Sequence, residues 1–152
     1  INPYRIVVTG RLKQSLSAFG EHVIVKEVEQ AIEQAILKTG NIVIEFTVAP
    51  RFKSKSLPAC HEWFIEFDGN VVEINNFGSL LDSELQKQNK YYKDLIDGKI
   101  IDRPVIRKIT KGGFKKYMSS IGKLGGQNKV PKIADNREIA DRLKKLNLIE
   151  SI

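Results

Sequence analysis

Two neighbouring segments in the middle of the chain alternate between apolar and polar positions, and this pattern limits the fold more than any other feature. The apolar row of the first segment consists of Ile42, Ile44, Phe46 and Val48. Residues 60–67 follow the same period, with Glu62 and Glu66 on one side and an opposite row of His61, Trp63, Ile65 and Phe67. Residues 50–58 between them are rich in prolines, serines and basic residues, which is typical of a turn. The pair therefore predicts one antiparallel hairpin, with the two glutamates in a solvent-facing row.

The segments around this hairpin predict further strands and helices. Residues 4–8, 22–25 and 105–109 are rich in β-branched side chains and predict strands. Apolar residues at helical spacing predict one helix from Glu27 to Gly40, and a longer one capped by Asn76 and ended by Gly98. From residue 22 the order is strand, helix, strand, strand, helix, strand. This order predicts an α+β fold of the split βαβ type, in which helices pack on one face of a single mixed or antiparallel sheet.

The C-terminal third contains two shorter helices and a loop between them. Apolar residues from Phe114 to Ile121 predict the first helix. Asp135, with Glu138 three residues later, predicts a capping box for the second. Residues 122–131 between the helices contain three glycines and a proline, so we expect a loop whose backbone can change shape before Pro131 fixes it.

Composition and charge limit the possible functions. The chain has 152 residues, with 41% hydrophobic and 28% charged, and neither a membrane-length apolar run nor a signal peptide is evident, so we expect one cytoplasmic domain. Cys60 is the only cysteine, and His22 and His61 are the only histidines. This set predicts neither a disulfide nor a metal site, and it makes a catalytic triad improbable.

One basic stretch carries the net charge of +7. Residues 105–132 hold no acidic residue, and their basic residues are Arg107, Lys108, Lys111, Lys115, Lys116, Lys123, Lys129 and Lys132. Such a stretch attracts phosphate, nucleotide, nucleic acid or an acidic protein face, although a solvated surface fits it as well. Within it, Lys129 lies on the glycine-rich loop, where its ammonium could be delivered to a phosphate that gains negative charge. An ordinary loop lysine is also compatible with this pattern.

Several motifs together resemble a known family. Thr9-Gly10-Arg11, followed by Lys13 and Gly20, is similar to the hinge of acyl-adenylate-forming enzymes. The segment from Leu16 to His22, the strands around Glu45 and Trp63, the helix of residues 80–92 and above all residues 125–132 (GGQNKVPK) resemble the auxin-responsive family of acyl-acid amido synthetases, in its bacterial-type members. The similarity covers nearly the whole chain. Its last motif is specific to the family, whereas its first is shared by the superfamily.

The resemblance implies a role for particular residues. Lys129 matches the lysine that bridges the acid's carboxylate and the α-phosphate of ATP, and Arg11 and Lys13 match the hinge arginine and pivot. Gly125, Gly126 and Gln127 would position the loop. Plant members usually have an aromatic residue in place of Asn128 and an arginine in place of Lys132, which puts the contacts of those side chains in doubt.

The resemblance also implies that the complete enzyme has two domains with different roles. Residues 1–20 would form the hinge and a short strand, and residues 21–152 a mobile C-terminal domain. A large N-terminal domain, absent from this chain, would bind ATP with Mg²⁺, the carboxylic acid and the amine or amino acid. We therefore expect this domain alone to be inactive, and we expect the basic stretch to line the face that closes over ATP.

Two other functions remain open from the sequence. An acyl-CoA ligase would use the same kind of domain and would release a thioester instead of an amide. An RNA-binding module would share the expected sheet and the positive charge, with Trp63, Phe64 and Phe67 as stacking rings. That family's aromatic signature strand is missing, however, and the strongest basic cluster lies outside the expected sheet.

Overall fold

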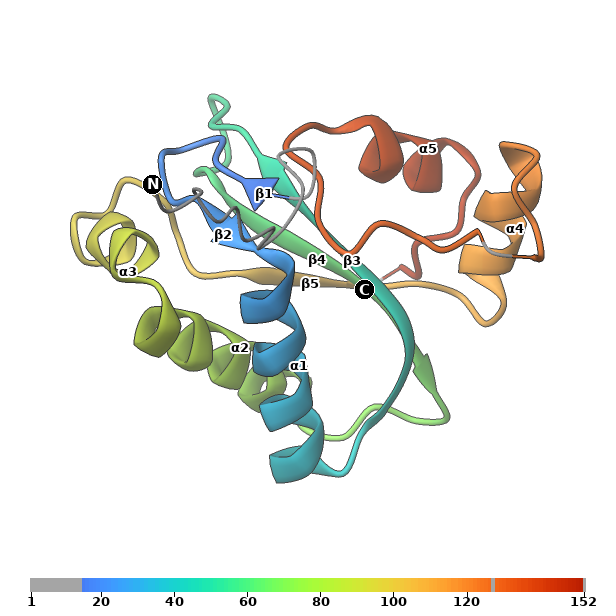
Figure 1. Cartoon of the computed structure of the whole chain (residues 1–152), viewed down its shortest axis with the longest axis horizontal. Helices are drawn as coiled ribbons and strands as arrows, with labels where there is room; N and C mark the ends of the chain where they lie inside the picture. Colours follow the sequence, from blue (N-terminus) through green and yellow to red (C-terminus); the bar gives the residue numbers. More distant parts are fainter. Residues whose placement is uncertain (1–14, 127, 152) are drawn as a thin grey trace, which may run out of the picture.

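A computed structural model describes residues 15–126 and 128–151, and it confirms the hairpin. Strands β3 (Ile42–Arg51) and β4 (Cys60–Asp68) pair antiparallel, with Val48 opposite Trp63. Strand β5 (Val105–Lys108) runs parallel to β4, so the order in this mixed sheet is β3-β4-β5 (Figure 1). A chain that returns to a parallel strand needs a crossover, and the helices between β4 and β5 supply it.

The start of β3 departs from the expected alternation. A register shift lies between Val43 and Glu45, so one extra residue is inserted there. As a result Ile42 and Ile44 are 59% and 50% exposed, whereas Val43 packs against the core. The predicted apolar row is therefore wrong for its first two members and right for Phe46 and Val48, because a bulge reverses which side chains face inward.

Three helices cover one face of the sheet. Helix α1 (Val25–Thr39) packs against α2 (Ile74–Gln88), and α3 (Lys90–Asp97) follows α2 (Figure 1). Their apolar stripes enclose Trp63 and Tyr92, both fully buried. Gly40 ends α1 with a φ of 76°, which glycine adopts without steric cost. None of the helices in the described part of the chain has the length and apolar character needed to cross a membrane.

The long helix predicted for residues 76–98 is in fact two helices. It begins at Ile74, so Asn76 is not its cap, and it is interrupted at Asn89. The Asn89 side chain caps α3 by accepting a hydrogen bond of 2.9 Å from the amide of Tyr92, and its Nδ2 donates to the carbonyl oxygen of His22. The sequence reading missed this break because the apolar stripe continues across it.

The opposite face of the sheet is covered by α4 (Gly113–Ser120) and α5 (Glu138–Lys145). Phe64 of β4 packs with Phe114 of α4 and Leu143 of α5 in a second core. The expected α+β class with a small mixed sheet is confirmed, but the expectation of helices on only one face is wrong, because these two helices cover the other face. The two glutamates on that face are consequently buried.

Short segments complete both edges of this sheet. Ile133 pairs with Val48 on the free side of β3, and Ile149 pairs with Ile109 just beyond β5. The strand predicted for residues 22–25 is reduced to β2 (Val23–Ile24), which pairs with β1 (Ser15–Leu16) in a separate two-stranded sheet. The strand predicted for residues 4–8 lies outside the described residues.

Candidate functional site

The site residues expected from the sequence fall into two groups. Gly125, Gly126 and Lys129 lie on the described loop after α4, whereas Arg11, Lys13 and Gln127 lie outside the described residues. Gly125 and Gly126 have φ values of 84° and 65°, in the left-handed region that favours glycine. Their positions therefore require glycine for the path of the loop.

This loop is fixed at both ends. At its start, the amide of Lys123 donates to the carbonyl oxygen of Met118, which closes the end of α4. At its end, Val48 of β3 donates from its amide to the carbonyl oxygen of Lys132, at 2.9 Å, and accepts from the amide of Ala134. Residues 132–134 are thus added to the edge of the sheet. Lys129 lies between these anchors and is exposed.

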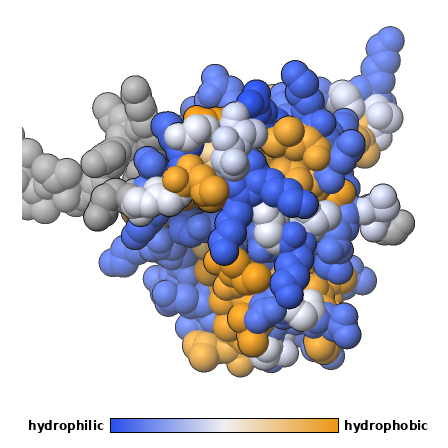
Figure 2. Space-filling model, turned by 90° about the vertical axis from the view of Figure 1, so that its right-hand side faces the viewer, coloured by the Kyte–Doolittle hydropathy of each residue, from blue (hydrophilic) through white to orange (hydrophobic). Residues whose placement is uncertain are grey.

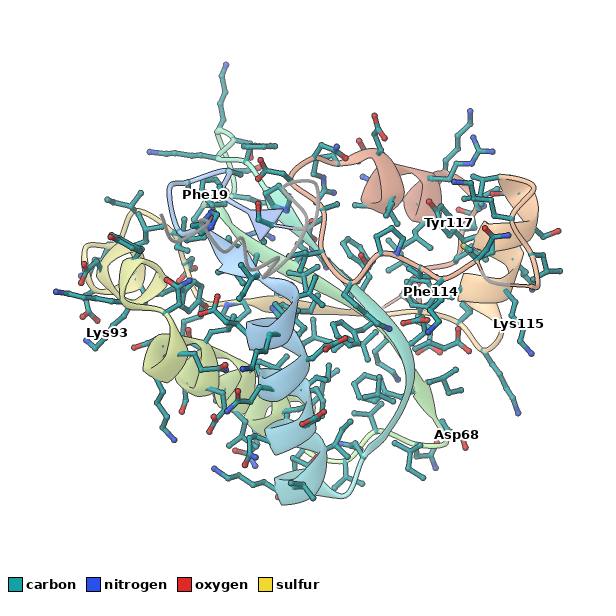
Figure 3. All side chains as sticks on the ribbon, viewed as in Figure 1. Phe19, Asp68, Lys93, Phe114, Lys115 and Tyr117 are labelled. Atoms are coloured by element: carbon teal, nitrogen blue, oxygen red, sulfur yellow. The ribbon has the colours of Figure 1, made fainter. Side chains whose placement is uncertain are left out.

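A groove of about 480 Å³ lies between the loop and the sheet. We call it the loop groove; residues that line it include Ile44, Glu45, Glu66, Phe114, Lys115, Met118, Lys123, Leu124 and Lys129. Figure 2 faces this side of the molecule and shows apolar patches among hydrophilic residues. In Figure 3, Phe114 and Tyr117 lie between α4 and the rest of the fold, whereas Lys115 is at the outer edge of the helix.

The loop groove is positively charged because its three unpaired lysines outnumber the one carboxylate that has no basic partner, Glu66. Glu66 is 4% exposed and accepts hydrogen bonds from the amides of Gly112 (3.0 Å) and Phe114 (3.2 Å) at the start of α4. Glu45 forms an ion pair with Lys132. Lys115, Lys123 and Lys129 form no ion pair with any described residue. Their charges therefore remain available to an anion.

The structure corrects the expectation that Glu62 and Glu66 face solvent. Each is 4% exposed, because α4 and α5 cover their side of the sheet. Glu62 is hydrogen-bonded to Arg107 and Arg137. Burial alone raises the pKa of Glu62, but the hydrogen bonds from the two guanidinium groups outweigh it and hold this pKa below its usual value. An alternating strand predicts one exposed face unless other elements are known to cover it. Nothing in the sequence of the hairpin reveals that α4 and α5 cover this face.

The basic stretch is divided by the fold. Arg107 is paired with Glu62, Lys108 with Glu150 at 3.0 Å, and Lys132 with Glu45. The other basic residues of residues 105–132 lie on or near α4 and the loop, and three of them line the loop groove. The sequence places Lys115 and Lys123 in the basic stretch expected to line the closing face, but no spacing in the sequence shows that they approach Lys129.

The rings expected to stack on RNA bases are inside the protein. Trp63 and Phe64 are at most 1% exposed, and Phe67 is 8% exposed. Base stacking needs an accessible ring face on the sheet, but helices cover both faces here. The structure therefore removes the stacking rings from the RNA-binding alternative.

His61 and Cys60, the other reactive side chains considered from the sequence, are both buried. His61 is fully buried, and its Nε2 lies 3.2 Å from Oε2 of the equally buried Glu21. Cys60 is also fully buried, and burial raises the pKa of its thiol to about 11, so it is a weak nucleophile. No group of three or more potential metal ligands occurs among residues 15–126 and 128–151.

Comparisons with known proteins agree with the fold. Residues 26–138 match the family model described as the GH3 family C-terminal domain. A solved structure titled "GH3.15 acyl acid amido synthetase" superposes with a TM-score of 0.72 at 19% identity, over 93% of this chain and 27% of that one. A second, titled "AtGH3.15 acyl acid amido synthetase in complex with 2,4-DB", gives a TM-score of 0.69 at 19% identity, over 93% and 26%. The chain thus spans about a quarter of the length of these two structures. No curated protein matches the sequence.

Proposed function

Since this chain belongs to the GH3 family, as a C-terminal domain, we propose that it is the closing domain of an ATP-dependent acyl acid amido synthetase. The titles of two solved structures with this fold name an acyl acid amido synthetase, which supports the proposed class of enzyme. Because the chain covers 27% of the first of them, the larger remainder of such an enzyme would supply the nucleotide and acid pockets. The domain would close over those pockets through a hinge at Arg11 and Lys13.

The proposed reaction has two steps. In the first, a carboxylate oxygen of the acid attacks the α-phosphorus of ATP, and the bond to pyrophosphate breaks, which leaves an acyl-adenylate. In the second, the amine nitrogen attacks the acyl carbon, AMP departs with the electrons of the broken C–O bond, and the amine loses a proton. Negative charge grows on the phosphate oxygens during the first step, so a cation placed there lowers the barrier.

Lys129 is the residue that we assign to this role. The observation that carries the assignment is its position: an exposed ammonium group, without an ion pair to any described residue, on a loop held at both ends. A lysine already paired with a carboxylate would have to break that pair before it could serve a phosphate. Gly125, Gly126 and Gln127 would set the path of the loop that presents it.

The groove fits phosphate groups better than it fits a metal ion. Lys115, Lys123 and Lys129 offer three ammonium groups, whereas Glu45 and Glu66 are already bonded within the domain. Mg²⁺ prefers carboxylate and water oxygens. We therefore assign the Mg²⁺ that accompanies ATP to the N-terminal domain.

The test is acyl-dependent pyrophosphate exchange by the full-length enzyme. Lys129→Ala should lower the exchange rate by about two to three orders of magnitude, the effect of removing one preorganised charge partner in other enzymes. Transfer from a supplied acyl-adenylate to the amine should be much less affected. Lys116→Ala is the matched control, because Lys116 is an exposed lysine of α4 that does not line the loop groove.

Normal exchange by the Lys129→Ala enzyme would exclude this lysine from the mechanism. The product tests the reaction class separately: an amide identifies a synthetase of the proposed kind. Release of a thioester after addition of coenzyme A would instead identify an acyl-CoA ligase.

A further inference from the structure

A second hollow, of about 470 Å³, lies at the other end of the same sheet face and shares no lining residue with the loop groove. We call it the arginine basin. Its basic residues are Arg51, Arg107, Arg137 and Lys144. Leu57 and Ile149 contribute apolar surface. The proposed function uses none of these side chains.

A buried carboxylate holds two of the arginines in place. Oε2 of Glu62 lies 2.8 Å from Nε of Arg107, and Oε1 accepts a hydrogen bond from Nη1 of Arg137. Arg137 also donates to the carbonyl oxygen of Pro50 at 3.2 Å. The Glu62 side chain is 5% exposed, so water competes little for these bonds. The two guanidinium groups therefore have fixed positions before any ligand arrives.

Each arginine keeps hydrogen-bond donors that no described residue uses. Arg107 binds Glu62 through Nε, which leaves both of its terminal nitrogens. Arg51 binds the carbonyl oxygen of Pro58 through Nε and Nη2, which leaves Nη1. Arg137 leaves Nη2, and the side chain of Lys144 has no hydrogen-bond partner among the described residues. The three arginines are half-buried and Lys144 is exposed, and donors of this kind fit a ligand with several acceptor oxygens.

The charge of the arginine basin also suits such a ligand. Its acidic lining residues are Glu62, which two arginines share, and Glu150, which Lys108 already neutralises. Asp141 lies 3.5 Å from Arg137 and offsets part of its charge. When the charges of Glu62 and Asp141 are subtracted from those of the four basic side chains, about two positive charges remain. This matches the charge of roughly −1.5 to −2 on a phosphate monoester at neutral pH.

We infer that the arginine basin binds a small organic phosphate, with its phosphate on the arginines and its apolar body against Leu57 and Ile149. The planar guanidinium group matches phosphate oxygens in pairs, and a hollow of this volume admits a small molecule. Since the two hollows have separate linings, this inference does not depend on the proposed catalytic role of Lys129.

The test is titration of the 152-residue chain with phenyl phosphate, followed by backbone amide NMR shifts. Shifts should concentrate at Arg107, Arg137 and Ile149, and phenyl phosphate should bind about tenfold more tightly than inorganic phosphate if its ring contacts the apolar wall. Lys144→Gln should weaken binding about tenfold, because it removes a charged donor and leaves Glu62 untouched. Lys116→Gln is the matched control and should leave the affinity unchanged, because Lys116 is an exposed lysine that lines neither hollow.

A Glu62→Gln variant distinguishes two explanations of phosphate binding: fixed positions of the guanidinium groups, and general attraction by positive charge. Attraction alone predicts tighter phosphate binding when a negative charge is removed. Fixed guanidinium positions predict weaker binding, because the carboxylate that holds them is lost. Circular dichroism checks that this variant folds, and if it does not, Lys144→Gln decides. The inference is overturned by equal affinity for inorganic phosphate, by equal weakening in Lys116→Gln and Lys144→Gln, or by tighter binding to a folded Glu62→Gln variant.

Discussion

The backbone amide of Ser17 donates a hydrogen bond of 2.8 Å to Oδ1 of Asp135, a residue 118 positions later in the chain. Ser17 lies a few residues after the expected hinge, and Asp135 directly follows the segment that ties the lysine loop to β3. The bond thus connects the two parts of the chain that the proposed closing motion would use. It also explains why Asp135 does not cap α5: the side chain of Asn136 accepts from the amide of Glu138 instead.

Asp135→Ala should destabilise the chain by about 1 kcal/mol, because it removes a charge-assisted hydrogen bond that is exposed to solvent. Urea unfolding measures this loss. Asp68→Ala is the matched control, because Asp68 is an exposed acid at the end of β4 without a side-chain partner among the described residues, visible at the edge of Figure 3. Equal stability of the two variants would mean that the Ser17 bond contributes nothing.

Two glycine substitutions should change stability in opposite directions. A Cβ at Gly113 would lie 2.4 Å from Cγ2 of the buried Ile109, so Gly113→Ala should cost about 1–3 kcal/mol through overpacking. A Cβ at Gly78, inside α2, would make an ordinary contact of 3.5 Å with Ile106, so Gly78→Ala should stabilise the helix by about 0.5–1 kcal/mol. Thermal unfolding of both variants and of the unchanged chain tests this prediction. A change of the two unfolding temperatures in the same direction would contradict it.

Local periodicity was enough to predict the main elements of the fold. The hairpin, α1 and the two C-terminal helices all follow from spacing, because each buries one apolar face. The bulge before Glu45 and the break at Asn89 do not, because a register shift or an asparagine cap leaves the apolar pattern almost unchanged. The burial of Glu62 was missed for another reason: it depends on partners 45 and 75 residues away.

Only the part of the candidate site that lies within the glycine-rich motif could be predicted from the sequence. The glycines before Lys129 predict a loop, and the structure has one there, with all three glycines of the loop in the left-handed region. The approach of Lys115 and Lys123 to the same groove depends on the end of α4 turning back toward β3. The roles proposed for Arg11, Lys13 and Gln127 come from the family resemblance and remain predictions.

The stability of the chain should depend on pH through Glu62. Because hydrogen bonds to Arg107 and Arg137 hold the pKa of this group below its usual 4.5, its contribution is present above about pH 4.5 and is lost as the pH falls through the lowered value. Glu62→Gln should destabilise the chain by about 3 kcal/mol at pH 7 and should reduce the further loss of stability between pH 5 and pH 3. Urea midpoints across this range provide the measurement, with Asp68→Asn as the control.

Lys115 and Lys123 should assist the proposed reaction through charge rather than through contact with the reacting atoms. Neither has an ion pair within the described part of the chain, and both line the groove that holds Lys129. Long-range attraction between exposed charges is screened by salt, with a Debye length of about 10 Å at 0.1 M. In the full-length enzyme, the double variant Lys115→Gln/Lys123→Gln should therefore raise the KM for ATP severalfold at low salt, with a small effect on kcat. The difference from the unchanged enzyme should shrink as salt is added.

Lys116→Gln should show neither effect, because its ammonium is not among the groups that line the loop groove. A double variant whose KM for ATP is normal at low salt would show that the loop groove does not attract the nucleotide.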